Sequence, residues 1–160
     1  MTANFPSHGR IAGIDFGTVR IGIAVTDPGR TLASPYENYT RRGVAADARR
    51  FQQLVEEERI MGFVVGLPVH TDGNESQKSW EARQFGEWLA GQTGVPVTFF
   101  DERYTSVDAE HLLADAQFTS KRRKSRRDML AAQILLASYL ESGGRDDSQR
   151  AIDDERRGGG

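Results

Sequence analysis

Cysteine is absent from this 160-residue chain. Its absence excludes disulfide bonds, thiolate catalysis and cysteine-ligated metal ions, and it favours a reducing compartment such as the cytoplasm. Hydrophobic runs long enough to span a membrane are also missing, and the N-terminus, MTANFPSHGR, lacks the apolar stretch of a secretory signal. We therefore expect a cytoplasmic protein without a membrane partner.

Charge of one sign is not in excess either, because the formal net charge is −2. A protein that coats nucleic acid nonspecifically is normally far more basic than this. The basic residues are nevertheless concentrated at one place, since six of the seven residues at 121–127 are Lys or Arg. The length and the 38% hydrophobic content suit one folded domain over residues 1–142, followed by a disordered, charged and glycine-ended tail over 143–160.

Hydrophobic periodicity and turn residues predict strands and helices in a mixed order. The expected strands are 10–17, 19–26, 31–39, 62–68 and 95–100, and the expected helices are 44–59, 77–92, 105–116 and 128–142. The first two strands are so close that they must form an antiparallel hairpin. The strands at 62–68 and 95–100 would lie parallel to the first one through right-handed crossovers. The sequence therefore predicts an α/β fold with a mixed five-stranded sheet flanked by helices.

Asp15 is a carboxylate inside a segment that otherwise reads as a central strand, with Ile14 and Phe16 beside it. Burial of a carboxylate costs several kcal/mol unless the group is paired or binds a cation. A basic partner and a metal ion both remain open as explanations. Gly17, which permits close backbone approach, and the Thr18 hydroxyl suit a ligand or metal site.

Two further positions carry acids near the ends of elements. Asp101 and Glu102 follow the strand at 95–100, and alternation places Glu102 on the face of Phe100 and Asp101 on the opposite face. Asp128 begins the last expected helix, where the helix dipole favours an acid whatever its function. The small residues after it, Ala131 and Ala132, would let this end of the helix pack close to the sheet.

A set of three carboxylates without a His or Cys cluster favours oxygen-preferring cations, either Mg²⁺ or Mn²⁺. Two such ions held about 4 Å apart activate water and stabilise the leaving oxygen of a phosphodiester. The basic run at 121–127 directly precedes Asp128 and could hold a nucleic-acid backbone, although a solvated loop is the alternative. These residues together favour a metal-dependent nuclease.

Four sequence blocks carry a resemblance that covers residues 10–142. They are DFGTVRIGIAVTD at 15–27, VVGLPVHTDGNES at 64–76, FFDERYTSVDAE at 99–110 and AAQILLASYLE at 131–141. In this order they resemble the YqgF family of pre-16S rRNA nucleases, which are relatives of the RuvC-type Holliday junction resolvases in the ribonuclease H-like superfamily. The resemblance implies a ribonuclease H-like fold and a cytoplasmic phosphodiester hydrolase that matures the 5′ end of 16S rRNA during ribosome biogenesis. Precursor rRNA, branched DNA and ribosome assembly intermediates are the partners that it suggests.

The motifs also imply residue roles. Asp15, Glu102 and Asp128 would be the catalytic and metal-binding acids, with Asp101 as a second candidate in the same motif. Substrate contacts are expected from residues beside these acids, namely Thr18, Arg20, Arg103, Lys121, Arg122, Arg123 and Lys124. The chain departs from the family pattern at Ser125–Arg127, where relatives tend to have apolar residues, and at His70, where they often have Asn. His70 could assist proton transfer, but a single loop histidine is more often incidental.

Three other functions remain open. An actin-like or Hsp70-like ATPase also has a D-x-G-T turn between antiparallel strands, but it needs a second domain and a second phosphate loop. A non-catalytic RNA-binding assembly factor would keep the fold and lose the chemistry. A Holliday junction resolvase should be a stable symmetric dimer, whereas this sequence shows no clear dimer interface and predicts a monomer or a weak dimer.

Overall fold

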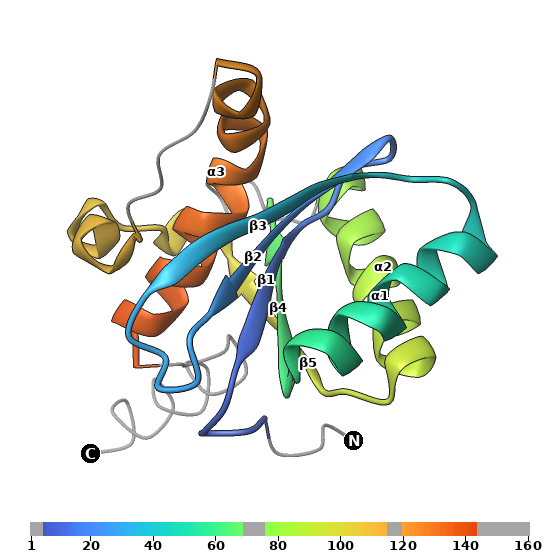
Figure 1. Ribbon diagram of the computed structural model, residues 1–160, viewed down its shortest axis with the longest axis horizontal. Coiled ribbons are helices and arrows are strands. Elements are labelled where there is room, and N and C mark those ends of the chain that lie inside the picture. Colours follow the sequence, from blue (N-terminus) through green and yellow to red (C-terminus); the bar gives the residue numbers. More distant parts are fainter. Residues whose placement is uncertain (1–4, 69–75, 115–119, 144–160) are drawn as a thin grey trace.

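The computed structural model describes residues 5–68, 76–114 and 120–143, with the backbone alone for 107, 108, 110 and 120–128. Its five-stranded sheet has the order β3-β2-β1-β4-β5 (Figure 1). The strands are β1 Ile11–Asp15, β2 Arg20–Thr26, β3 Ala33–Thr40, β4 Gly62–Leu67 and β5 Val97–Asp101. The helices are α1 Val44–Glu58, α2 Gln77–Thr93, α3 Ser120–Glu141 and two short 3-10 helices, η1 Glu102–Tyr104 and η2 Val107–Leu112.

The predicted mixed sheet is confirmed. β1 and β2 form an antiparallel hairpin in which Asp15 lies opposite Gly22, and β3 continues the antiparallel part. β4 and β5 are parallel to β1, as Ile14 opposite Val65 and Leu67 opposite Asp101 show. The carboxyl ends of β1, β4 and β5 therefore lie together at one edge of the sheet, which is where ligand sites form in such folds.

Each face of the sheet buries its own core. Helices α1 and α2 cover one face, where Phe51 and Leu54 of α1 and Phe85 of α2 pack against β-strand residues such as Ile23 and Phe63 (Figure 1). Helix α3 covers the other face, and its residues Leu135, Leu136 and Tyr139 pack against Ile11, Val64 and Phe100. None of the described helices is long and apolar enough to cross a membrane.

Helix α3 lies in direct contact with the central strand. A Cβ on Gly13 of β1 would stand 2.9 Å from the Leu136 Cβ and 3.0 Å from the Ala132 carbonyl oxygen. The expectation that small residues bring this helix close to the sheet is confirmed for Ala132, which is fully buried, whereas Ala131 is exposed. Phe5, which precedes β1, stacks edge-on against Tyr139 near the end of α3, so α3 runs antiparallel to β1.

The predicted helix at 105–116 is wrong. Its proposed cap, Thr105, instead donates its hydroxyl to the Glu102 carbonyl oxygen, and the Ser106 amide donates to Ser138 Oγ of α3. The chain then pairs with the edge strand, where the Ala114 amide donates to the Ala33 carbonyl oxygen. These ties to α3 and β3 leave room for only short 3-10 turns.

The predicted start of the last helix is also wrong, because α3 begins at Ser120 and not at Asp128. The segment SKRRKSRR contains no Gly or Pro, and Lys and Arg are good helix formers. The basic run therefore lies on the first turns of α3 rather than in a loop. The predicted tail at 143–160 falls almost entirely outside the described residues.

Candidate active site

Asp15 is the last residue of β1, and its half-buried side chain projects from the face covered by α3. Strand alternation fixes this direction, because Ile14 belongs to the core under α1 and α2 while Ile11 belongs to the core under α3. The Asp15 carboxylate forms no ion pair or hydrogen bond with a described residue. The basic partner that could have explained a buried acid is thus not found in the described part of the chain.

Glu102 reaches the same place from β5. It immediately follows the strand, and its Oε1 lies 2.8 Å from the position that a Cβ would take on Gly66 of β4. Gly66 follows Val65, which is paired with Ile14, so continuing the register places Gly66 beside Asp15, about 4.8 Å away across the strands. The predicted face for Glu102 is confirmed, and the two carboxylates meet above a glycine.

Sequence reasoning missed Gly66. An isolated glycine inside an apolar strand, as in GFVVGLP, is a known indication that another group approaches the backbone closely. Here the approaching group is the Glu102 carboxylate, with the Leu135 Cδ2 at 3.2 Å from the same Cβ position.

The electrostatics of the two acids agree with this geometry. Burial raises the pKa of the Asp15 carboxyl above its ordinary value. Burial also raises the pKa of Glu102, and the negative charges of Asp15 and Asp101 raise it further. Like charges that approach each other without a compensating cation favour protonation, so this pair is arranged to gain from a bound positive charge.

Asp101 has a different environment. Its carboxylate accepts the Arg103 amide at 2.9 Å and the Arg103 Nε at 2.8 Å, and only 3% of its surface is exposed. Phe99 and Val97, two and four residues earlier, pack against the core under α1 and α2, so Asp101 faces away from Asp15. Glu102 is the better candidate of this acidic pair, and the predicted substrate role of Arg103, whose guanidinium binds Asp101, stays a prediction.

The structure describes only the backbone of Asp128, the third predicted acid, and that backbone gives its position. Asp128 lies one turn before Ala132, whose carbonyl oxygen contacts the Gly13 position, and Asp15 is two residues beyond Gly13. Because α3 is antiparallel to β1, the step from Ala132 back to Asp128 and the step from Gly13 on to Asp15 lead toward the same end of the sheet. The side chains of Asp128 and of the basic run at 121–127 lie outside the described set, and so does His70. Among the side chains that are described, no three His, Cys, Asp or Glu residues are grouped to hold a metal ion.

The turn that follows Asp15 is fixed on both sides. A Cβ on Gly17 would lie 2.3 Å from the Arg20 carbonyl oxygen, so no other residue fits there without a backbone shift. The Phe16 ring packs against Phe85 at 4.8 Å between centroids, and the Arg41 guanidinium lies 5.3 Å from the Phe16 centroid. These contacts hold the turn that carries Thr18.

A buried carboxylate holds Arg41 in that position. Asp47 of α1 accepts hydrogen bonds from the Tyr39 hydroxyl at 2.6 Å, the Arg42 amide at 2.9 Å and the Arg41 Nε at 3.1 Å. Burial alone would raise the pKa of Asp47, but these hydrogen bonds and the Arg41 charge outweigh it and lower the pKa. The network ties the end of β3 to the start of α1 and, through Arg41, to Phe16.

The arrangement of Asp15 and Glu102 fits a hard cation. Both carboxylates are half-buried, neither has a described cationic partner, and the space above Gly66 would be filled by a Cβ. Carboxylate oxygens are the ligands that Mg²⁺ and Mn²⁺ prefer.

Several known proteins are similar to this chain. A family model described as RuvX, Holliday junction resolvase, matches residues 9–142. A Rhodopirellula baltica protein is 49% identical over 138 residues, which cover 86% of this chain and 80% of the relative. A Neisseria gonorrhoeae protein is 42% identical over 135 residues, which cover 84% and 89%. Both are named as candidate pre-16S rRNA nucleases.

A solved structure shares the fold. Thermus thermophilus RuvC in complex with a Holliday junction substrate matches with a TM-score of 0.56 at 18% identity, covering 87% of this chain and 99% of that one. This similarity confirms the predicted ribonuclease H-like fold. The family match and the identity to the curated relatives confirm the predicted resemblance as well, and the chain belongs to the RuvX family of Holliday junction resolvases.

Proposed function

We propose that this protein is a metal-dependent nuclease that hydrolyses phosphodiester bonds in precursor 16S rRNA, at the site formed by Asp15, Glu102 and Asp128. The observation that carries the proposal is the convergence of Asp15 and Glu102 above Gly66 without a cationic partner among the described residues. Family membership and the names of the curated relatives support the nuclease class.

The acids of this chain would hold Mg²⁺ or Mn²⁺. When bound, the cation supplies charge neutralisation at the phosphate and lowers the pKa of its bound water. Asp15, fixed by the turn that follows it, would hold the cation from the central strand. Glu102 would be a second ligand from the end of β5, and Asp128 on α3 would be the third. The basic first turns of α3 supply positive charge for the substrate backbone, which is expected to make binding salt-dependent.

The names of the relatives favour precursor rRNA as the substrate, and maturation of the 5′ end in the cytoplasm is the step we assign to it. Four-way DNA junctions are the second candidate, favoured by the description of the family and by the fold of RuvC. A resolvase must cut two strands in register and so requires a symmetric dimer. The actin-like ATPase alternative gains no support from the family match.

The test compares the wild type with Asp15→Asn and Glu102→Gln on a labelled precursor 16S rRNA fragment and on a four-way DNA junction, each with Mg²⁺, with Mn²⁺ and with EDTA. Glu87→Gln in α2 is the matched control, since Glu87 is an exposed carboxylate on a helix of the opposite face. We expect cleavage of the RNA by the wild type and the control, and a loss of about 10² or more in rate for both site variants.

The outcomes separate the alternatives. Site variants that cut as fast as the wild type would show that the carboxylate mechanism is wrong. Cleavage of the junction in preference to the RNA, together with a dimer in sedimentation, would assign the protein to junction resolution. RNA binding without cleavage of either substrate would assign it to non-catalytic ribosome assembly.

A further inference from the structure

The end of the sheet that carries Asp15 also carries an arginine with no assigned task in the structure. Arg20 begins β2, is exposed, and forms no ion pair or hydrogen bond with a described residue. Two other arginines of the described part of the chain near this edge are engaged, since Arg41 binds Asp47 and Arg103 binds Asp101. A guanidinium that has no partner among the residues described, and that lies beside the carboxylate pair of the proposed active site, is available to an anionic partner from outside the chain.

Arg20 projects on the same face of the sheet as the two acids. Ile21, Ile23 and Val25 of β2 all belong to the core under α1 and α2, so alternation directs Arg20 to the face covered by α3. Gly22, the residue between Arg20 and Ala24 on that face, is the cross-strand partner of Asp15. Glycine leaves no side chain between Arg20 and Asp15.

The neighbouring strand adds a hydroxyl. Thr40, the last residue of β3, lies directly opposite Arg20, is exposed, and shares its face because cross-strand partners point the same way. Its hydroxyl has no hydrogen bond with a described residue. Guanidinium and hydroxyl groups are the usual side-chain donors to phosphate oxygens.

The spacing suits consecutive phosphates of one strand. Asp15 and Gly22 are about 5 Å apart across the ladder, and Arg20 is two residues, about 7 Å, farther along β2, so the Arg20 and Asp15 Cα atoms lie about 9 Å apart. That separation is comparable to the distance between neighbouring phosphates in an extended nucleic-acid strand. The carbonyl of Arg20 is packed against Gly17, so the backbone that presents the guanidinium is held in a fixed turn.

From this geometry we propose that Arg20 and Thr40 form a phosphate-binding subsite for the phosphodiester next to the one that is cut. The substrate strand then runs along the carboxyl edge of the sheet, from Glu102 on β5 past Asp15 on β1 to the paired ends of β2 and β3. The first turns of α3, whose backbone carries the basic run at 121–127, stand at the same end of the molecule as the β1–β2 turn (Figure 1). The inference rests on the proposed nuclease function and assigns the position of one substrate phosphate.

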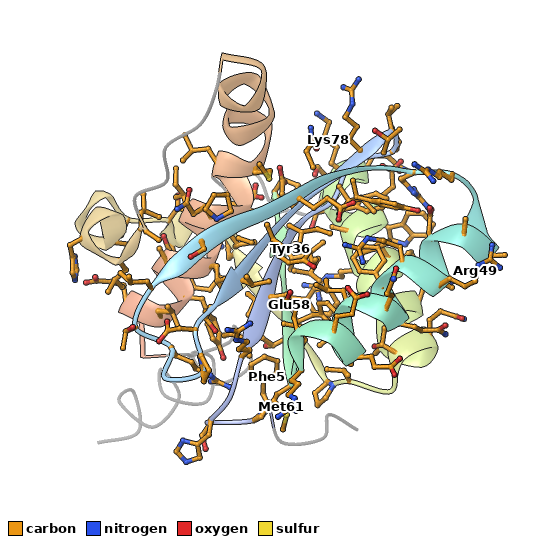
Figure 2. All side chains as sticks on the ribbon, viewed as in Figure 1. Phe5, Tyr36, Arg49, Glu58, Met61 and Lys78 are labelled. Carbon is orange, nitrogen blue, oxygen red and sulfur yellow. The ribbon has the colours of Figure 1, made fainter. Side chains whose placement is uncertain are left out.

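The first experiment measures binding alone. The full chain carrying Glu102→Gln is titrated with a fluorescein-labelled single-stranded RNA at a series of KCl concentrations, with and without Arg20→Gln or Thr40→Val. The control is Arg49→Gln, because Arg49 of α1 is exposed and points outward from the opposite face of the sheet (Figure 2). We expect Arg20→Gln to weaken binding about tenfold and to reduce the slope of log K against log[salt] by about 0.7, which corresponds to one phosphate contact.

The second experiment locates the phosphate. A single neutral methylphosphonate is moved along the RNA around the cleaved bond, and kcat/KM is measured for the wild type and Arg20→Gln. The wild-type kcat/KM is expected to fall when the neutral linkage adjoins the cleaved bond. For Arg20→Gln, the neutral linkage at that one position should cause no further fall in kcat/KM. Arg20→Lys should retain the salt slope and recover part of the rate.

The outcomes distinguish a failure of the phosphate subsite from a failure of the proposed nuclease function. An unchanged salt slope for Arg20→Gln, or equal sensitivity of wild type and variant at every methylphosphonate position, would overturn the subsite even if the protein cuts RNA. A reduced slope with no cleavage by the wild-type chain would leave the phosphate site standing and overturn the nuclease proposal.

Discussion

A methyl group placed on Gly66 tests whether the space between Asp15 and Glu102 is the working part of the site. In Gly66→Ala the new Cβ would lie 2.8 Å from Glu102 Oε1 and 3.2 Å and 3.4 Å from the two terminal carbons of Leu135. The Glu102 carboxylate is the flexible end of a side chain and moves away, whereas Leu135 is buried and must yield by a few tenths of an ångström.

The cost to stability is small and the cost to activity is large. Overpacking of this kind costs about 1–3 kcal/mol, and the reduced freedom of the unfolded chain returns about 0.5–1 kcal/mol for a change from Gly to Ala. We therefore expect the free energy of unfolding to fall by about 1 kcal/mol. Displacement of Glu102 by about 1 Å should lower kcat/KM about 10²-fold.

The assay pairs thermal denaturation with RNA cleavage in Mn²⁺. Gly91→Ala in α2 is the control, because beyond the neighbouring turns of its own helix no described atom lies within 4 Å of its Cβ position, and it should be slightly stabilising and fully active. In a Glu102→Gln background, Gly66→Ala should reduce the rate no further, since both changes act on the same carboxylate. A folded Gly66→Ala protein that cuts at the wild-type rate refutes the reasoning.

Two further predictions concern Asp15 in the site and Asp47 in the network beside it. Burial raises the pKa of Asp15, so its ionised form destabilises the folded state at neutral pH. Asp15→Asn should therefore raise the melting temperature in EDTA at pH 7. A lower melting temperature would mean that Asp15 is structurally paired. The pKa of Asp47 is shifted in the opposite direction, because it is lower in the folded protein than in the unfolded chain. Ionised Asp47 therefore stabilises the fold at pH values above its unfolded pKa of about 3.9, and this stabilisation is lost as the pH falls through its folded pKa. In urea denaturation at pH 7, Asp47→Asn should therefore lower the free energy of unfolding by about 2–3 kcal/mol, and the difference from wild type should narrow in acid. A difference that does not depend on pH would contradict this assignment.

The sequence predicted most of the sheet and two of the helices because their periodicity is strong. The hairpin at 10–26 and the apolar runs at 62–68 and 95–100 could hardly form anything else. The start of α3 could not be found in the same way, since apolar periodicity begins only at Met129 and the preceding SKRRKSRR has none. The turns after Glu102 depend on hydrogen bonds to Ser138 and Ala33, which are distant in sequence.

The site was predicted in part for similar reasons. Asp15 stands out because it is an acid inside an apolar strand. Alternation placed Glu102 and Asp101 on opposite faces, and the resemblance to the family motif favoured Glu102. The ion pair between Asp101 and Arg103 and the closeness of Glu102 to Gly66 depend on side-chain conformations and on the order of the strands. Neither can be deduced from spacing along the chain.

The position of α3 against β1 has a consequence during synthesis. Asp15 and Asp128 are separated by more than a hundred residues, so on a translating ribosome they emerge roughly 6–23 seconds apart. Until α3 emerges, the sheet face that includes Ile11, Val64 and Phe100 has no cover. The nascent chain therefore closes its second core only when α3 emerges, which is also when Asp128, the third acid proposed for the site, becomes available.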